Sequence, residues 1–252
     1  MKTNKSAVLR PSVYGRLIDR YLFNFRIAQE ILEKRLPPIN WLKPRIINGF
    51  GVVSFCLLRL EGVTVWPIPS FLGANAISCA YRCAVVDNSG PRPEPSVYVL
   101  GRNTNLPIIS RLGSAVFSGP MKRIITNIEE RPSLFSRLVD IRTSYLDGRK
   151  LFSARVEKAS SSRINSKLFS SLDDFVDFIK GGLSSYTPST RQNHYSRVDL
   201  QEDSNCYEPV VATIDYNWLE KEWPDSGLVF DSAFHAGGGL YKLKYLGLQS
   251  SE

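Results

Sequence analysis

The sequence has no uninterrupted apolar run of about 18 residues or more, which is what a membrane-spanning helix requires. The N-terminal segment MKTNKSAVLRPSVYGR has early lysines but lacks the apolar stretch of a secretory signal peptide. We therefore expect a cytoplasmic protein that does not bind membranes, with residues 1–15 as a flexible N-terminal segment. All 252 residues are expected to form one domain, because β-rich domains often reach this length.

Cysteine and histidine are scarce, with four and two copies respectively. Cys79 and Cys83 lie close together, but they occur in ISCAYRCAVV, whose alternation predicts a strand. Four residues of strand cover about 13 Å, which exceeds the distance that a disulfide can bridge. His194 and His235 match no zinc or calcium spacing, and His235 is expected at an edge or turn. The sequence thus predicts free, partly buried thiols, no metal site and no cofactor.

Common nucleotide-binding and hydrolase motifs are also missing. The sequence contains no Rossmann fingerprint, no P-loop and no GxSxG motif. The glycines of HAGGGL, at residues 237–239, match none of these spacings. A glycine-rich loop that holds phosphate groups is therefore not expected, and a serine hydrolase is not favoured.

Positive charge is in excess, because 32 Lys and Arg residues against 24 Asp and Glu residues give a formal net charge of +8. These positive residues are scattered, and the densest groups, RLIDRYLFNFR and KRLPPINWLKPR, mix bases with apolar residues. The pattern favours a generally basic surface over a specific nucleic-acid interface. We expect a small organic ligand as the partner, and the sequence leaves a homo-oligomer open.

Two segments have the periodicity of short helices. In IAQEILEKRLPP, apolar residues from Ile27 to Leu36 recur at helical spacing before a Pro-Pro stop. In SLDDFVDFIKGG, Ser171 is a favourable N-cap, two aspartates follow in the first turn, and two glycines end the pattern. Both segments are expected to flank a sheet.

Most other apolar segments predict strands. Two strands joined by a turn at Glu61-Gly62 are expected in GFGVVSFCLLRLEGVTVWPIP, and a hairpin joins ISCAYRCAVV to SVYVLGRN across DNSGPRPEP. Further strands are expected from about Lys122 and in LFSARVEKA, YEPVVATIDY, LVFDSAFHA and LYKLKYL, whereas SSYTPSTRQNHYSRVDLQEDSN is expected to be a polar loop. The lack of regular strand–helix alternation predicts an α+β protein that is mainly antiparallel β.

One basic pair could have a chemical role. The stretch SGPMKRIITNIEE places Lys122 and Arg123 between a Gly-Pro turn and a β-branched run. An amine that faces an apolar interior is desolvated, and a second cation nearby disfavours its protonated form, so it can act as a Schiff-base nucleophile. Adjacent basic residues are also commonly solvated, and neighbours on a strand point to opposite faces. From these residues alone, a reactive amine and two surface charges both remain open.

The order of several segments resembles a known family. YLFNFRIAQEILEKRLPP, AYRCAVV, SVYVLGRN, SGPMKRIITNIE and DSAFHAGGGLYKLKYL follow one another as in the acetoacetate decarboxylase-like superfamily, from about Arg20 to Leu246. More narrowly, the chain is similar to an uncharacterised bacterial branch, a domain of unknown function, with an Arg-containing strand at Tyr81-Arg82. The resemblance implies an antiparallel β-barrel or cone-like sheet with a few short flanking helices and a largely apolar internal cavity.

The resemblance also implies roles for individual residues. The segment GPMKR takes the place of the family's Gly-aromatic-Pro-Lys-Lys motif, so Lys122 would form the Schiff base beside the cationic Arg123. Arg20 would bind the carboxylate of the substrate. Where the family has a glutamate on the core strand, AISCAYRCAVV has no acid and offers Ser78 and Arg82 as substrate-binding residues.

Two functions are compatible with this resemblance. The first is a Schiff-base-forming, decarboxylase-like lyase that acts on a small oxo acid. The second is a non-catalytic protein that binds a small molecule in the same cavity. Both hypotheses predict a small organic ligand inside the fold.

Overall fold

The computed structural model describes residues 12–111, 121–132, 137–159, 164–203, 206–215 and 227–251. The helices are α1 (Gln29–Arg35), η1 (Ser70–Leu72) and α3 (Leu172–Gly181), and residues 107–111 are also helical. The strands are β1 (Ser12–Ile27), β2 (Leu42–Pro44), β3 (Ile46–Ile47), β4 (Phe50–Val65), β5 (Ala74–Asp87), β6 (Glu94–Thr104), β7 (Met121–Pro132), β8 (Arg137–Tyr145), β9 (Lys150–Lys158), β10 (Ser184–Pro188), β11 (His194–Asp203), β12 (Tyr207–Asp215), β13 (Val229–Gly237) and β14 (Leu240–Ser250). The fold is therefore mainly β, as predicted.

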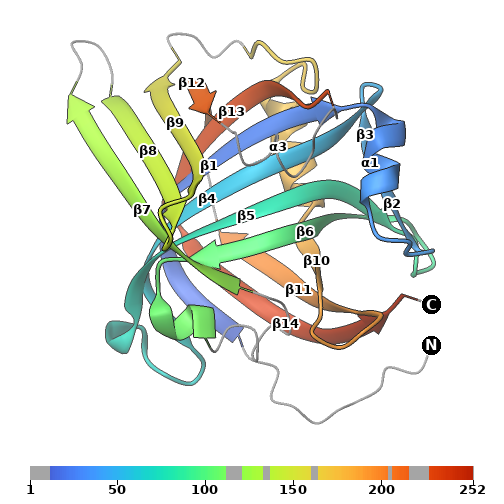
Figure 1. Cartoon of the computed structure of the whole chain (residues 1–252), viewed down its shortest axis with the longest axis horizontal. Helices are drawn as coiled ribbons and strands as arrows, with labels where there is room; N and C mark the ends of the chain where they lie inside the picture. Colours follow the sequence, from blue (N-terminus) through green and yellow to red (C-terminus); the bar gives the residue numbers. More distant parts are fainter. Residues whose placement is uncertain are drawn as a thin grey trace.

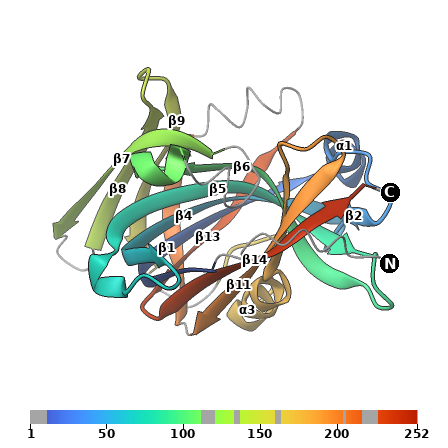
Figure 2. The same ribbon diagram turned by 90° about the horizontal axis from the view of Figure 1, so that it is seen from below.

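The strands form one 14-stranded sheet in the order β10-β11-β14-β1-β13-β12-β9-β8-β7-β6-β5-β4-β3, with β2 paired to β5. The additional pairings β1–β4 and β10–β6 close this sheet into rings that share β1, β4, β5 and β6 (Figure 1). β6 pairs in parallel with β7 and with β10, so the sheet is mixed rather than wholly antiparallel. In Figure 2, β7–β9 lie on one side of the shared strands, and β11, β14 and α3 lie on the other. Both faces of the shared strands are consequently covered.

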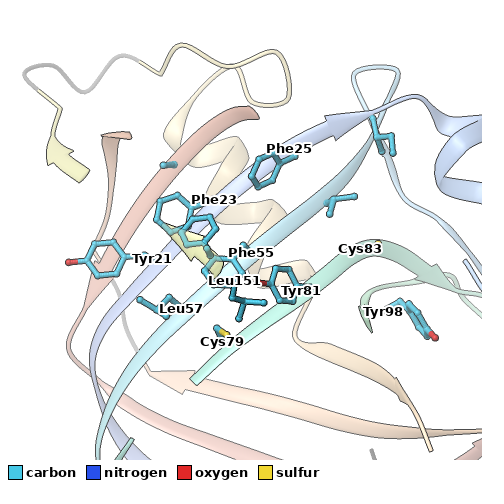
Figure 3. Close-up of a cluster of buried hydrophobic side chains, with 14 of the residues drawn as sticks. Tyr21, Phe23, Phe25, Phe55, Leu57, Cys79, Tyr81, Cys83, Tyr98 and Leu151 are labelled. Carbon is cyan, nitrogen blue, oxygen red and sulfur yellow. The ribbon is translucent and has the colours of Figure 1, made fainter. Parts of the chain in front are cut away.

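The first covered face is built from aromatic residues. Phe23, Phe55 and Tyr81 are partners on neighbouring strands and point to the same side of the sheet, and we call this side the aromatic face (Figure 3). The ring of Phe152 on β9 packs on it, with its centroid 4.0 Å from that of Phe55 and 4.8 Å from that of Phe23. Contacts between such rings stabilise a core by more than the burial of their apolar surface alone. The aromatic face therefore joins the shared strands to β7–β9.

The opposite face of the shared strands carries Arg20, and we call it the arginine face. Helix α3 covers part of it, and its start follows from the sequence, because Ser171 and Asp174 form a capping box. Phe175 of α3 stacks on Phe234 of β13, with the ring centroids 3.5 Å apart. Helix α3 thus packs through apolar side chains on one part of the arginine face, while β10, β11 and β14 cover the rest.

Three expectations about elements are corrected by the structure. The segment expected to be two strands is the single strand β4, because Gly62, with φ +59, and a register shift between Leu60 and Val63 produce a bulge instead of a turn. The expected polar loop forms β10 and β11, which pair with each other and with β6 and β14. β1 begins at Ser12, inside the segment expected to be flexible, and continues to Ile27, which was expected in a helix.

The thiol prediction is confirmed, since Cys56, Cys79 and Cys83 are free and buried, and Cys206 is free and exposed. Among the helices of the described ranges, none is both long enough and apolar enough to span a bilayer.

Candidate functional site

The register of the sheet separates the predicted site residues onto its two faces. Side chains that are direct partners on neighbouring strands point to the same face. One such row belongs to the aromatic face and consists of Tyr21, Leu57, Cys79, Asn103 and Lys122. The next row belongs to the arginine face and consists of Arg20, Leu58, Ser78, Thr104 and Arg123. Lys122 is therefore on the opposite side of the sheet from Arg20 and Ser78.

Lys122 and Arg123 follow Met121, the first residue of β7, and both side chains are exposed. The Lys122 amine lies 5.4 Å from the centroid of the Tyr145 ring, and Tyr145 itself is buried. The lysine is thus at the margin of the aromatic face and in contact with its core. Gly119 and Pro120, the first part of the expected lysine motif, lie outside the described residues. The Schiff-base role of Lys122 stays a prediction.

Arg20 is buried inside the fold, where only 2% of it is exposed. Its Nη1 donates hydrogen bonds to Glu202 Oε2 at 2.5 Å and to the Tyr207 hydroxyl at 3.0 Å. Burial alone lowers the pKa of Arg20, but its negative and polar neighbours, among them Glu202, outweigh burial and raise the pKa overall. Arg20 is therefore a buried cation with a buried carboxylate partner.

Arg82 lies near Arg20 on the same face and is only 8% exposed. No hydrogen bond or ion pair joins its guanidinium to another residue of the described ranges, and its buried Nε has no partner. Burial lowers the pKa of Arg82, and the charge of Arg20 lowers it further. A cavity of about 10 Å³ adjoins Arg82 and is also lined by Ser54, Ser96 and Arg45. This volume is enough for about one water molecule.

A third arginine extends the cluster. Arg102 on β6 donates from Nη2 to Ser185 Oγ of β10 at 2.9 Å, and its Nε is buried without a partner. Burial lowers the pKa of Arg102, and the neighbouring Arg82 adds to that effect. We call Arg20, Arg82 and Arg102 the arginine cluster. Glu202 is its only carboxylate partner among the described residues, so the cluster has an excess of positive charge.

Ser78, expected to bind substrate, is half-buried on the arginine face. Its hydroxyl donates to Thr104 Oγ1 at 3.2 Å, and that threonine is fully buried. Ser78 therefore links β5 to β6 beside the cluster. The structure brings Arg20 and Arg82 together, places Ser78 on their side of the sheet, and separates all three from Lys122.

Arg102 and the partners of the arginine cluster were not selected from the sequence. Ser185 and Glu202 come from the segment expected to be a polar loop, and Tyr207 begins the expected strand YEPVVATIDY, where no pattern marks it as a partner of Arg20. One signal was available, because Val198, Leu200 and Glu202 alternate as on a strand. The alternation predicts that Glu202 shares a buried face with apolar residues, where a carboxylate requires a cationic partner.

A second polar group surrounds His235, which lies inside β13 rather than at the expected edge or turn. Its Nε2 is 2.9 Å from Asp19 Oδ1, and its Nδ1 is 3.1 Å from Glu208 Oε1. Burial lowers the pKa of His235, but the hydrogen bonds with these two carboxylates outweigh burial and raise it. Across the described ranges, no three His, Cys, Asp or Glu side chains are grouped so that they could hold a metal ion.

Neither a family model nor a curated protein sequence matches the chain. Several solved structures share its fold. The enduracididine biosynthesis enzyme MppR in complex with pyruvate has a TM-score of 0.61 at 11% identity, with 99% of this chain and 94% of that one covered. The acetoacetate decarboxylase of Legionella pneumophila has a TM-score of 0.61 at 11% identity, with coverage of 93% and 87%. An acetoacetate decarboxylase-like enzyme of Sphingomonas wittichii RW1 has a TM-score of 0.60 at 10% identity, with coverage of 96% and 92%.

These similarities show that the chain has the acetoacetate decarboxylase-like fold over nearly its whole length. They confirm the fold that the resemblance in sequence predicted. The narrower resemblance to one uncharacterised bacterial branch stays a prediction.

Proposed function

We propose that this protein binds a small organic acid on its arginine face, with the carboxylate of the ligand paired to Arg82. The observation that carries the proposal is the buried side chain of Arg82, whose guanidinium forms no hydrogen bond or ion pair with another described residue and whose buried Nε has no partner. Removing a charged side chain from water costs several kcal/mol, even after the protein relaxes. Glu202 accepts a hydrogen bond from Arg20 and also acts electrostatically on Arg82, so one carboxylate balances three arginines and an added anion would reduce the excess positive charge.

The chemistry of the cluster indicates which anion fits. A guanidinium is planar and presents parallel N–H donors, so it binds the two oxygens of a carboxylate with good geometry. The Nε groups of Arg20, Arg82 and Arg102 are buried without hydrogen-bond partners, so each leaves one donor unsatisfied. The similar enzyme MppR has been solved with pyruvate, which makes oxo acids the first class to examine.

The experiment is a thermal-shift titration with pyruvate, acetoacetate and longer 2-oxo acids, with chloride and sulfate as reference anions. At a ligand concentration of about 100 Kd, we expect stabilisation by about 2.7 kcal/mol. Arg82→Met should abolish this stabilisation. Arg123→Met, which removes an exposed arginine of the same face, should leave it unchanged. Equal stabilisation of wild type and Arg82→Met, or a response to inorganic anions alone, would contradict the proposal.

A second candidate function is Schiff-base chemistry at Lys122. It is supported by the position of the Lys122 amine against the Tyr145 ring, at the margin of the aromatic face. The amine would attack the carbonyl carbon of an oxo acid, and water would leave as the imine forms. Arg123, the expected neighbour in this chemistry, belongs to the row on the opposite face.

Borohydride reduction in the presence of acetoacetate or pyruvate tests this candidate. Lys122 should gain the mass of the bound oxo acid less one oxygen atom, because water leaves as the imine forms and reduction then adds two hydrogens. This gain should vanish in Lys122→Ala but persist in Lys180→Ala. Failure to find an adduct with any oxo acid, or an adduct that Lys122→Ala does not change, would exclude it.

A further inference from the structure

A groove of about 750 Å³ opens where β1, β11 and β14 meet the connection between β4 and β5. Ligand sites commonly have volumes of about 300–1,000 Å³. Its apolar lining includes Tyr14, Phe71, Leu240 and Tyr241, and its cations are Arg16 and Lys242. The groove is thus large enough for an organic molecule, whereas the cavity of about 10 Å³ beside Arg82 is not.

Tyr241 connects this groove to the arginine cluster. It lines the groove, yet only 6% of it is exposed. In the pairing of β11 with β14, Tyr241 is the direct partner of Glu202, so both side chains point to the same face. Glu202 in turn accepts a hydrogen bond from Arg20. Tyr241 therefore lines the groove and is also the strand neighbour of Glu202, the carboxylate partner of Arg20.

The charges in the groove also suit an acid. The Lys242 amine lies 5.2 Å from the centroid of the Tyr14 ring, and no ion pair joins it to a carboxylate of the described ranges. Arg16 faces Glu61 at 3.9 Å, and both side chains are largely exposed, so this pair is weak. An approaching anion would meet a groove with a net positive charge, and the arginine cluster behind Tyr241 is also positive.

The glycines of HAGGGL explain how Tyr241 reaches this position. Gly238 and Gly239 adopt φ values of +80 and +107, which side-chain-bearing residues rarely adopt. They form the turn between β13 and β14 directly before Leu240 and Tyr241. This motif therefore shapes one wall of the groove.

Resting on the proposed function, we propose that the natural ligand is an elongated, amphipathic acid whose apolar body occupies this groove and whose carboxylate pairs with the arginine cluster. None of the three arginines lines the groove, so this binding requires the buried Tyr241 side chain to move aside. A molecule as small as pyruvate would leave the groove unfilled. A longer chain buries apolar surface against Phe71 and Leu240 and gains affinity with each methylene.

The experiment is isothermal titration with pyruvate, 2-oxohexanoate and 2-oxooctanoate. Affinity should rise about fourfold for each added methylene that reaches the groove. Phe71→Ala should lower the affinity for 2-oxooctanoate about tenfold and leave pyruvate unchanged. Leu72→Ala is the matched control, because Leu72 is its neighbour in η1, is 67% exposed against 83% for Phe71, and does not line the groove. Both variants remove exposed side chains and should fold normally.

The outcomes separate the two proposals. If affinity is the same at every chain length but still depends on Arg82, the groove proposal is overturned and the proposed function stands. If Phe71→Ala and Leu72→Ala have equal effects, the groove is likewise overturned as the site. If long acids bind in the groove with undiminished affinity in Arg82→Met, the link to the arginine cluster is overturned, and the proposed function fails with it.

Discussion

At the scale of single residues, Arg82 is the least expected feature of the molecule. Buried arginines in folded proteins are normally paired, because an unpaired charge in the interior is costly. Arg82 is 8% exposed and forms no pair with the described part of the chain, while Arg20 on the same face has both a carboxylate and a hydroxyl partner. We interpret this difference as a sign that Arg82 is a binding residue, which the protein retains although its unpaired charge lowers stability.

This interpretation predicts that Arg82→Met stabilises the ligand-free protein. Methionine fills a similar space without a charge, and comparable replacements of buried charges raise stability by about 1–4 kcal/mol. Urea unfolding in buffer without organic acids measures the change. A clear loss of stability would show that Arg82 supports the fold and would argue against a binding role.

His235 predicts a pH dependence of stability. Hydrogen bonds with Asp19 and Glu208 outweigh burial and raise the folded-state pKa of His235 above its ordinary value of 6.5. A raised pKa contributes stability that is fully present below pH 6.5 and is lost as pH rises through the folded-state value. The pKa values of Asp19 and Glu208 are lowered, despite burial, by His235 and by Arg59 or Lys158, so their contributions are lost only on acidification.

The measurement is the unfolding free energy of wild type and His235→Gln from pH 5.5 to 9. The stability advantage of wild type should be largest at the acidic end and shrink as pH rises. His194→Gln serves as the control, because the His194 ring is hydrogen-bonded to the Gln192 carbonyl and to no carboxylate of the described ranges. An advantage that is constant or grows with pH would contradict the account.

At the scale of elements, local sequence signals predicted helix α3 and the hairpin of β5 and β6 correctly. Ser171, the following aspartates and the closing glycines act within a few residues of each other, so one segment contains all the information needed. β10 and β11 were missed because their inward polar residues, such as Ser185 and Glu202, have partners on distant strands. The same reason explains why the face of Lys122 could not be predicted, since it depends on the register between β6 and β7.

The cap of α3 provides a test at this scale. Ser171→Ala removes the acceptor of the Asp174 backbone N–H, which lies 3.1 Å away, and should lower the unfolding free energy by about 1 kcal/mol. Chemical denaturation measures this value. Ser170→Ala changes the preceding exposed serine and should be nearly neutral; a loss as large as that of Ser171→Ala would show that the cap is not the cause.

At the scale of the whole molecule, β1, β4, β5 and β6 belong to both rings, so neither ring can unfold without exposing the other. We predict a single cooperative transition for the chain, as expected of one domain. Trp41, whose indole donates to the Ser250 carbonyl oxygen at 2.9 Å, reports on the contact between the segment after α1 and the end of β14. Tryptophan fluorescence and far-ultraviolet circular dichroism should therefore give the same midpoint, and two separated midpoints would contradict the prediction.

The central claim is that this chain, with the acetoacetate decarboxylase-like fold, binds an organic acid on its arginine face and not on the face of Lys122. The most direct measurement is a crystal structure of the protein saturated with 2-oxooctanoate. We predict density for the carboxylate in hydrogen-bond contact with Arg82, between β5 and β11, with the chain of the ligand extending past Tyr241 into the groove. Density for the acid beside Lys122 on the aromatic face, with the arginine cluster empty, would contradict the account.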